Sequence, residues 1–144
     1  MIAIAIASAL RAFVMPRKLG YVTGADGTTQ IIPNLVRVPD VGFFSRHRFK
    51  DGIPPEPVPL LVPDLAVEVL SASNTPGEME RKRREYFDAG VRLVWCVDIK
   101  ARTVTVYTSP ENPQIVTEQQ SLDGGDVLPG FALPLAPLFA ELDD

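Results

Sequence analysis

The distribution of proline constrains this fold more than any other feature of the sequence. The chain has 144 residues and 14 prolines, most of which lie between apolar runs. Proline lacks a backbone donor and interrupts helix interiors and central strands, so these prolines mark loops and strand ends. Four of them fall within the six residues 54–59, which predicts a long loop over residues 51–63. A loop of this length inside a compact domain is often functional or mobile.

Between the prolines, local signals predict two longer helices. Residues 1–14 are expected to form a buried helix that ends before the first proline of the chain. Residues 76–89 carry stronger signals, because Thr75 can act as N-cap, Glu78 completes a capping box and Gly90 suits the C-terminal cap. Strands are predicted at residues 21–23, 28–32, 36–44, 61–71, 93–98 and 103–107, with a further candidate at 115–119 and a short helix at 134–142. This order predicts one α/β (α+β) domain over residues 1–144, with a mixed curved sheet flanked by helices.

Composition excludes several classes of protein. One cysteine, Cys96, and one histidine, His47, allow neither an internal disulfide nor the usual structural zinc site, which fits a reducing, cytoplasmic location. The apolar N-terminal stretch lacks a basic start, is interrupted by Arg11 and is too short to span a bilayer, so no membrane role is expected. The net charge of −4 argues against a broadly DNA-coating protein but leaves a nuclease open.

The run VPDLAVEVL places a carboxylate inside an otherwise apolar strand. The strand period of two puts Asp64 and Glu68 on one face, whereas Leu65 and Val67 face the other way as core. A buried carboxylate is costly unless it has a cation, a hydrogen-bond donor or a proton. About 13 Å of strand separates Asp64 from Glu68, too far for one ion, so Asp64 is expected to fix a loop. The better partner for Glu68 is Asp40, in VPDVGFF, on a neighbouring strand.

The helix after this strand supplies a lysine. Met79, Lys82 and Tyr86 share one helical stripe, which should face the sheet. Two carboxylates, a divalent ion and a lysine form a minimal set for hydrolysis of a phosphodiester. The simpler alternatives are a capping or surface role for Asp40 and Glu68, and a snorkelling lysine at position 82.

Two basic runs are candidates for contact with phosphates. Arg46 and Arg48 belong to the first run, and Arg81 to the second. A charge run is more often a solvated face, and DNA binding by these three arginines is the functional alternative.

Four segments in order carry a family resemblance. They are RVPDVGFFSRHRF, VPDLAVEVLSASN, KRREYFDAGVRLVWCVDIKARTVTVYTS and DVLPGFALPLAPLF. Together they resemble the Uma-two family of predicted restriction endonucleases over about residues 20–142. The resemblance implies a restriction-endonuclease-like core of the PD-(D/E)xK class, dependent on Mg²⁺ or Mn²⁺ and commonly homodimeric.

By position, the resemblance assigns the metal-binding acids to Asp40 and Glu68. Leu70 stands where the class places its lysine, and Lys82 matches the helix position that members of this family use instead. Related chains usually begin earlier and carry an acid on the first helix, whereas the first acid here is Asp26. We therefore expect either a missing N-terminal segment or a naturally short member.

Three functional hypotheses follow. The first is a Mg²⁺-dependent DNA endonuclease with Asp40, Glu68 and Lys82 as its catalytic residues. The second is a catalytically weak or inactive relative that acts in DNA binding or dimerisation. The third is a structural protein, in which Glu68 and Lys82 pair only with each other. The first hypothesis predicts that Asp40 and Glu68 converge within reach of one ion and that Lys82 approaches them.

Overall fold

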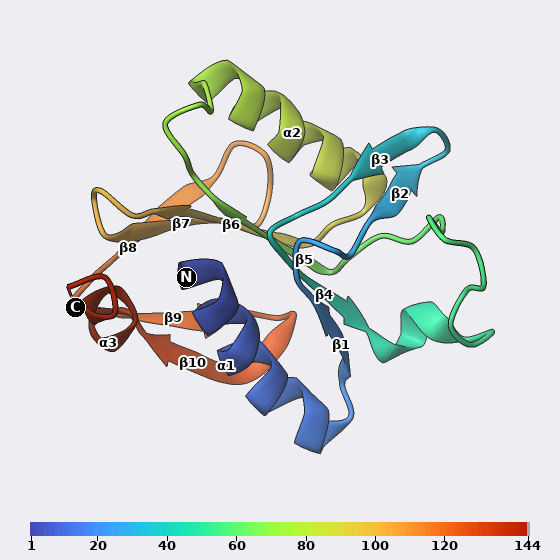
Figure 1. Ribbon diagram of the computed structural model, residues 1–144, viewed down its shortest axis with the longest axis horizontal. Helices are drawn as coiled ribbons and strands as arrows, with labels where there is room; N and C mark the ends of the chain where they lie inside the picture. Colours follow the sequence, from blue (N-terminus) through green and yellow to red (C-terminus); the bar gives the residue numbers. More distant parts are fainter. Residues whose placement is uncertain (144) are drawn as a thin grey trace.

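A six-stranded sheet forms the centre of the molecule (Figure 1), which is described for residues 1–143 of a computed structural model. Its strands lie in the order β1-β4-β5-β6-β7-β8, with β5 and β6 parallel and the other neighbours antiparallel. The predicted α+β fold with a mixed sheet is confirmed. The elements are α1 (Ile2–Arg17), β1 (Gly20–Thr23), β2 (Thr29–Ile32), β3 (Leu35–Arg37), β4 (Val41–Ser45), a 3₁₀ turn η1 (Arg46–Phe49), β5 (Leu65–Val69), α2 (Pro76–Ala89), β6 (Leu93–Asp98), β7 (Thr103–Tyr107), β8 (Pro113–Thr117), β9 (Ser121–Gly124), β10 (Leu128–Pro134) and α3 (Leu135–Ala140).

The sheet separates two apolar layers (Figure 1). On one face, α1, the β9–β10 hairpin and α3 pack against the larger core, which contains Leu65, Val67 and Trp95. On the other face, α2 packs through Tyr86 against a smaller cluster that includes Ala66. The alternation along β5 therefore turns Glu68 toward α2, as the period of two predicts.

Helix α1 is longer than the sequence predicts. Every fourth residue from Ile2 to Val14 is buried, so one stripe of the helix lies on the sheet. The helix continues through Pro16 to Arg17, because the hydrogen bond that proline forfeits falls in the last turn, which the amides of Lys18 and Leu19 close. Among residues 1–143, no helix is both long enough and apolar enough to cross a bilayer.

Helix α2 has the predicted bounds and caps. The amide of Glu78 donates to Thr75 Oγ1 at 3.1 Å, the Glu78 carboxylate bonds back to the Thr75 amide, and Gly90 adopts a left-handed conformation, with φ of 111°. These contacts are local in sequence, which is why the pattern alone predicts the helix so closely.

The prediction of a single strand over residues 36–44 is wrong, because this segment contains parts of two strands. β3 ends at Arg37 and pairs with β2, whereas β4 begins at Val41 and enters the main sheet. Pro39 stands between them and cannot donate to a ladder. The strand predicted at residues 61–71 is shorter than expected, Leu65–Val69, and the prediction did not include the β9–β10 hairpin.

The proline-rich loop over residues 51–63 is attached to β2. The amide of Gln30 donates to Pro59 O at 2.8 Å, and its side chain donates to Val58 O at 3.0 Å. The amide of Leu61 donates back to Gln30 O at 2.9 Å. The second half of the loop is thereby fixed beside the β2–β3 hairpin.

Candidate active site

Neighbouring strands bring Asp40 and Glu68 together. The β4–β5 ladder pairs Val41 with Val67, so Asp40 and Glu68 stand opposite each other one step further along the two chains. Opposing residues of an antiparallel pair project to the same face, with Cβ atoms about 5 Å apart. Asp40 Oδ2 accepts a hydrogen bond from the amide of Val69 at 2.7 Å. The Asp40 carboxylate is therefore held against β5 beside Glu68.

Glu68 is a buried carboxylate with two donors on one oxygen. Its exposed fraction is 6%, and Oε1 accepts from Tyr86 Oη at 2.7 Å and lies 2.9 Å from Lys82 Nζ. Burial raises the pKa of Glu68 above its ordinary value of 4.5, and the Asp40 charge adds to the effect, although Tyr86 and Lys82 act in the opposite direction. Within residues 1–143, Oε2 accepts no hydrogen bond from protein, so one oxygen remains available.

Lys82 reaches Glu68 because of its position on α2. It belongs to the stripe with Met79 and Tyr86 that faces the sheet, while its side chain keeps 29% of its surface exposed. Its ammonium group is thus paired at one side and open to solvent at the other. A lysine in this setting can both hold the buried carboxylate and meet a substrate anion.

Tyr86 is a site residue that the sequence prediction missed. It is 1% exposed, its hydroxyl donates to Glu68 Oε1, and its pKa is raised by burial and by the Glu68 charge. The phenol therefore stays protonated and acts as a fixed donor. The sequence could have indicated this role, because Tyr86 lies on the same helical stripe as Lys82 and its hydroxyl can donate to the buried Glu68.

The basic residues predicted to bind DNA occupy different places. β4 separates Asp40, at its beginning, from Arg46 and Arg48, beyond its end, by roughly 17–20 Å of strand. Arg46 is exposed and donates to Lys18 O at 3.3 Å. Arg48 donates from Nε and Nη2 to the two oxygens of Asp64, each at 2.9 Å. The structure therefore does not gather Arg46 and Arg48 at the carboxylate pair, and Arg48 is already engaged by Asp64.

Arg81 does lie at the candidate site, in a groove of about 260 Å³ between α2 and the β2–β3 hairpin. Arg37 and Lys82 line the same groove. Glu85 pairs with Arg37 and lies 3.9 Å from Arg81 Nε, so one carboxylate positions two guanidinium groups near Lys82. Arg37 was not predicted as a site residue, and its partner is 48 residues away in the chain.

Oxygen ligands for a divalent ion are present, but they are few. Within residues 1–143, no group of three or more His, Cys, Asp or Glu side chains is arranged to hold a metal ion. Asp40 Oδ2 and Glu68 Oε1 accept hydrogen bonds from protein, and among residues 1–143 the second oxygen of each carboxylate accepts none. Two carboxylates suit Mg²⁺, which prefers oxygen ligands, keeps several waters and is commonly bound by one or two carboxylates with substrate phosphates.

Burial of the Glu68 charge predicts a stability effect. Because its folded pKa is raised, Glu68 contributes most stability when protonated and loses that contribution as pH rises through the folded pKa. We expect Glu68→Gln to raise the thermal midpoint in EDTA at pH 8, and to change it less near pH 4. A lower midpoint for the variant at pH 8 would mean that Lys82 and Tyr86 outweigh the cost of burial.

Comparisons with known proteins support a nuclease fold. A family model for Uma2, described as "Putative restriction endonuclease", matches residues 1–136. The structure of this chain is similar to a crystal structure of a "putative nuclease belonging to DUF820" from Anabaena variabilis. The TM-score is 0.84 and the sequence identity is 19%, over 98% of this chain and 79% of that one. No curated protein sequence matches the chain. At this identity the structural likeness establishes the fold alone.

Proposed function

Because the chain belongs to the Uma2 family, we propose that it is a metal-dependent nuclease that hydrolyses phosphodiester bonds of DNA. The observation that carries the proposal is the buried Glu68, paired with Lys82 and standing opposite Asp40 at the junction of two strands. A buried carboxylate and ammonium pair is an expensive arrangement for stability alone. Perturbed ionisable groups of this kind concentrate at functional sites. A homodimeric state and a cytoplasmic location belong to the same proposal.

Each residue has a distinct role in this reaction. Asp40 and Glu68 would hold Mg²⁺ or Mn²⁺ through their free oxygens. The ion would polarise a phosphoryl oxygen of the substrate and would lower the pKa of a bound water molecule. The Lys82 ammonium group stabilises the negative charge that develops on the phosphate, and it can orient the attacking water. Arg37 and Arg81, which line the groove beside Lys82, would hold a neighbouring phosphate.

Ion binding tests this proposal directly. We expect the thermal midpoint to rise with Mg²⁺ or Mn²⁺ concentration, by about 1.4 kcal/mol of stability when the free ion is tenfold above its Kd. Glu68→Gln should abolish the rise. Glu111→Gln, at an exposed glutamate, is the matched control and should keep it. Plasmid cleavage in Mn²⁺ by the wild type, and not by Glu68→Gln, completes the test.

The alternative function is a DNA-binding or dimerising module without catalysis. The observation that favours it is an opening helix with no acidic residue, together with a site that offers two carboxylates. Retention of DNA binding without ion-dependent stabilisation or cleavage would support this alternative. Ion-dependent stabilisation that disappears in Glu68→Gln would exclude it.

Tyr86 predicts a smaller effect on ion binding. Tyr86→Phe removes one hydroxyl that fixes Glu68 and keeps the aromatic packing, so we expect the ion to bind about 10–100-fold more weakly. Titration calorimetry with Mn²⁺ measures the change. Tyr21→Phe, at a 41% exposed tyrosine on β1, is the control and should bind as the wild type does. Equal affinities in all three proteins would remove Tyr86 from the site.

A further inference from the structure

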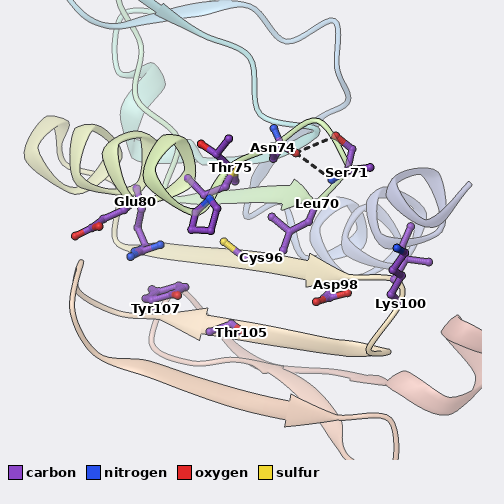
Figure 2. A pocket seen from close by; sticks show the side chains of 15 residues that line it. Leu70, Ser71, Asn74, Thr75, Glu80, Cys96, Asp98, Lys100, Thr105 and Tyr107 are labelled. Carbon is purple, nitrogen blue, oxygen red and sulfur yellow. Dashed lines mark hydrogen bonds between the residues drawn. The ribbon is translucent and has the colours of Figure 1, made fainter.

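A second and larger cavity lies on the other side of α2 from the arginine groove. It measures about 640 Å³ and is bounded by the loop after β5, the first turns of α2 and the α2-facing side of β6 and β7. Figure 2 shows Tyr107 and Thr105 along one wall, Asn74 and Thr75 across from them, and Lys100 at one end. We call this cavity the α2–β7 pocket. Its volume lies in the range of pockets that take small organic ligands and exceeds what a bare phosphate needs.

The α2–β7 pocket borders the candidate active site. Met79, Arg83 and Cys96 line it and also line the small void that contains Glu68 and Lys82. In the parallel ladder Glu68 pairs with Cys96, and adjacent strands lie about 4.8 Å apart. The pocket and the candidate site are therefore neighbours that share a wall formed by Met79, Arg83 and Cys96.

The pocket offers an aromatic and cationic surface. The guanidinium of Arg83 lies 4.1 Å from the centre of the Tyr107 ring, and its Nε donates to Pro110 O at 2.9 Å. Leu70 and Met79 add apolar wall. Burial raises the pKa of Cys96 to about 11, so the thiol between these groups stays neutral. Flat apolar surface beside a guanidinium is the surface on which nucleobases stack.

The charged side chains of the pocket differ in whether they already have a partner of opposite charge. Within residues 1–143, neither Arg83 nor Lys100 forms a salt bridge, whereas Glu80 is paired with Arg84, and Asp98 accepts from the amide of Ala101. Two cations in this part of the chain thus lack an acidic partner, while Glu80 is paired with Arg84. Asn74 accepts from Ser71 through Oδ1, which leaves its amide nitrogen available as a donor to a base edge.

We propose that the α2–β7 pocket receives one unstacked nucleotide of the cleaved strand, next to the scissile phosphate. Its base stacks on the outer face of the Arg83–Tyr107 pair, and its phosphate meets Arg83, while Lys100, at the other end of the pocket, faces the next phosphate of the strand. A base reaches such a pocket only when it leaves the duplex, which costs least for unpaired nucleotides. The substrate class is therefore single-stranded DNA, or duplex DNA with an unpaired nucleotide. This inference rests on the proposed nuclease function.

Binding measured in EDTA tests the pocket without catalysis. We expect a fluorescein-labelled single-stranded 12-mer to bind the wild type about tenfold more tightly than its matched duplex, measured by anisotropy. Tyr107→Leu, which removes the ring, and Arg83→Gln, which removes the charge, should each erase most of this preference. Arg11→Ala, at an exposed arginine on α1 outside the pocket, should retain it.

A second measurement uses the wild-type protein alone. A series of 12-mers, each lacking one base at a different position, should show one position at which loss of the base weakens binding by about tenfold. If duplex and single strand bind equally and no abasic position matters, while ion-dependent stabilisation and cleavage persist, the pocket inference fails and the nuclease proposal stands. If no DNA of any form binds and no ion stabilises the protein, both fail.

Discussion

Lys82→Met is expected to lower the turnover of DNA cleavage by about 10²–10³-fold, the usual effect of removing one group that stabilises charge in the transition state. Methionine keeps the apolar stem that packs on α2 and removes only the ammonium group. The loss should appear in kcat more than in KM, because the proposed phosphate contacts of Arg37 and Arg81 would remain. Lys82→Arg should recover little, since a planar guanidinium does not replace a compact point charge.

The control for this experiment lies on the same helix. Arg84 is half exposed and pairs with Glu80 and Glu111 at the surface, so Arg84→Ala should cleave DNA at the wild-type rate. Circular dichroism and thermal midpoints establish that both variants fold. Wild-type turnover in Lys82→Met would show that the pair of Lys82 with Glu68 is structural and would end the assignment of Lys82 as a catalytic residue.

Local patterns predicted the parts of the fold whose signals are local. The caps of α2 lie within a few residues of the helix, and the apolar run of β6 and the alternation along β7 are equally local, so these predictions were correct. The break at Pro39 was missed because an apolar run continues on both sides of it. The β9–β10 hairpin was missed because β9 is short and β10 contains prolines and pairs irregularly, with a register shift between Leu128 and Ala132.

The candidate site was predictable to the extent that one strand and one helix stripe define it. Glu68 stood out as a carboxylate in an apolar run, and Lys82 followed from its stripe. The partners that come from distant segments could not be predicted. Arg37 contacts Glu85 across 48 residues, and Arg48 contacts Asp64 across 16. Sequence spacing contains no information on such pairs, which arise when the β2–β3 hairpin packs against α2 and the 3₁₀ turn packs against β1 and β4.

Arg48→Met is expected to have the largest effect on stability. Asp64 is completely buried, and its carboxylate accepts two hydrogen bonds from Arg48 and one from the amide of Ser45 at 2.7 Å. Its carbonyl oxygen accepts from the amides of Arg92 and Leu93, so Asp64 joins β4, η1 and the start of β6. Removing the guanidinium leaves a buried carboxylate with one donor, which costs about 3 kcal/mol, or about 10 °C in midpoint.

The pH dependence of this loss identifies its cause. Burial by itself would raise the pKa of Asp64, but the hydrogen bonds from Arg48 and Ser45 outweigh it and hold the pKa below its ordinary value of 3.8. A depressed pKa contributes stability above the unfolded value, and that contribution disappears as pH falls through the folded value. The difference between wild type and Arg48→Met should therefore be full near pH 7 and shrink below about pH 4.

Variants at a neighbouring arginine and at Asp64 distinguish loss of the Arg48–Asp64 ion pair from the loss of an arginine side chain in general. Arg46→Met, on the same turn, removes an exposed guanidinium and should change stability by less than about 0.5 kcal/mol. In the Asp64→Asn background, Arg48→Met should cost much less than in the wild type, because no buried charge remains to be compensated. An equal cost in both backgrounds, unchanged between pH 7 and pH 3, would assign the effect to lost packing of the arginine stem and not to the carboxylate. In that case the role of Asp64 would be to join β4 to the start of β6 through its backbone hydrogen bonds.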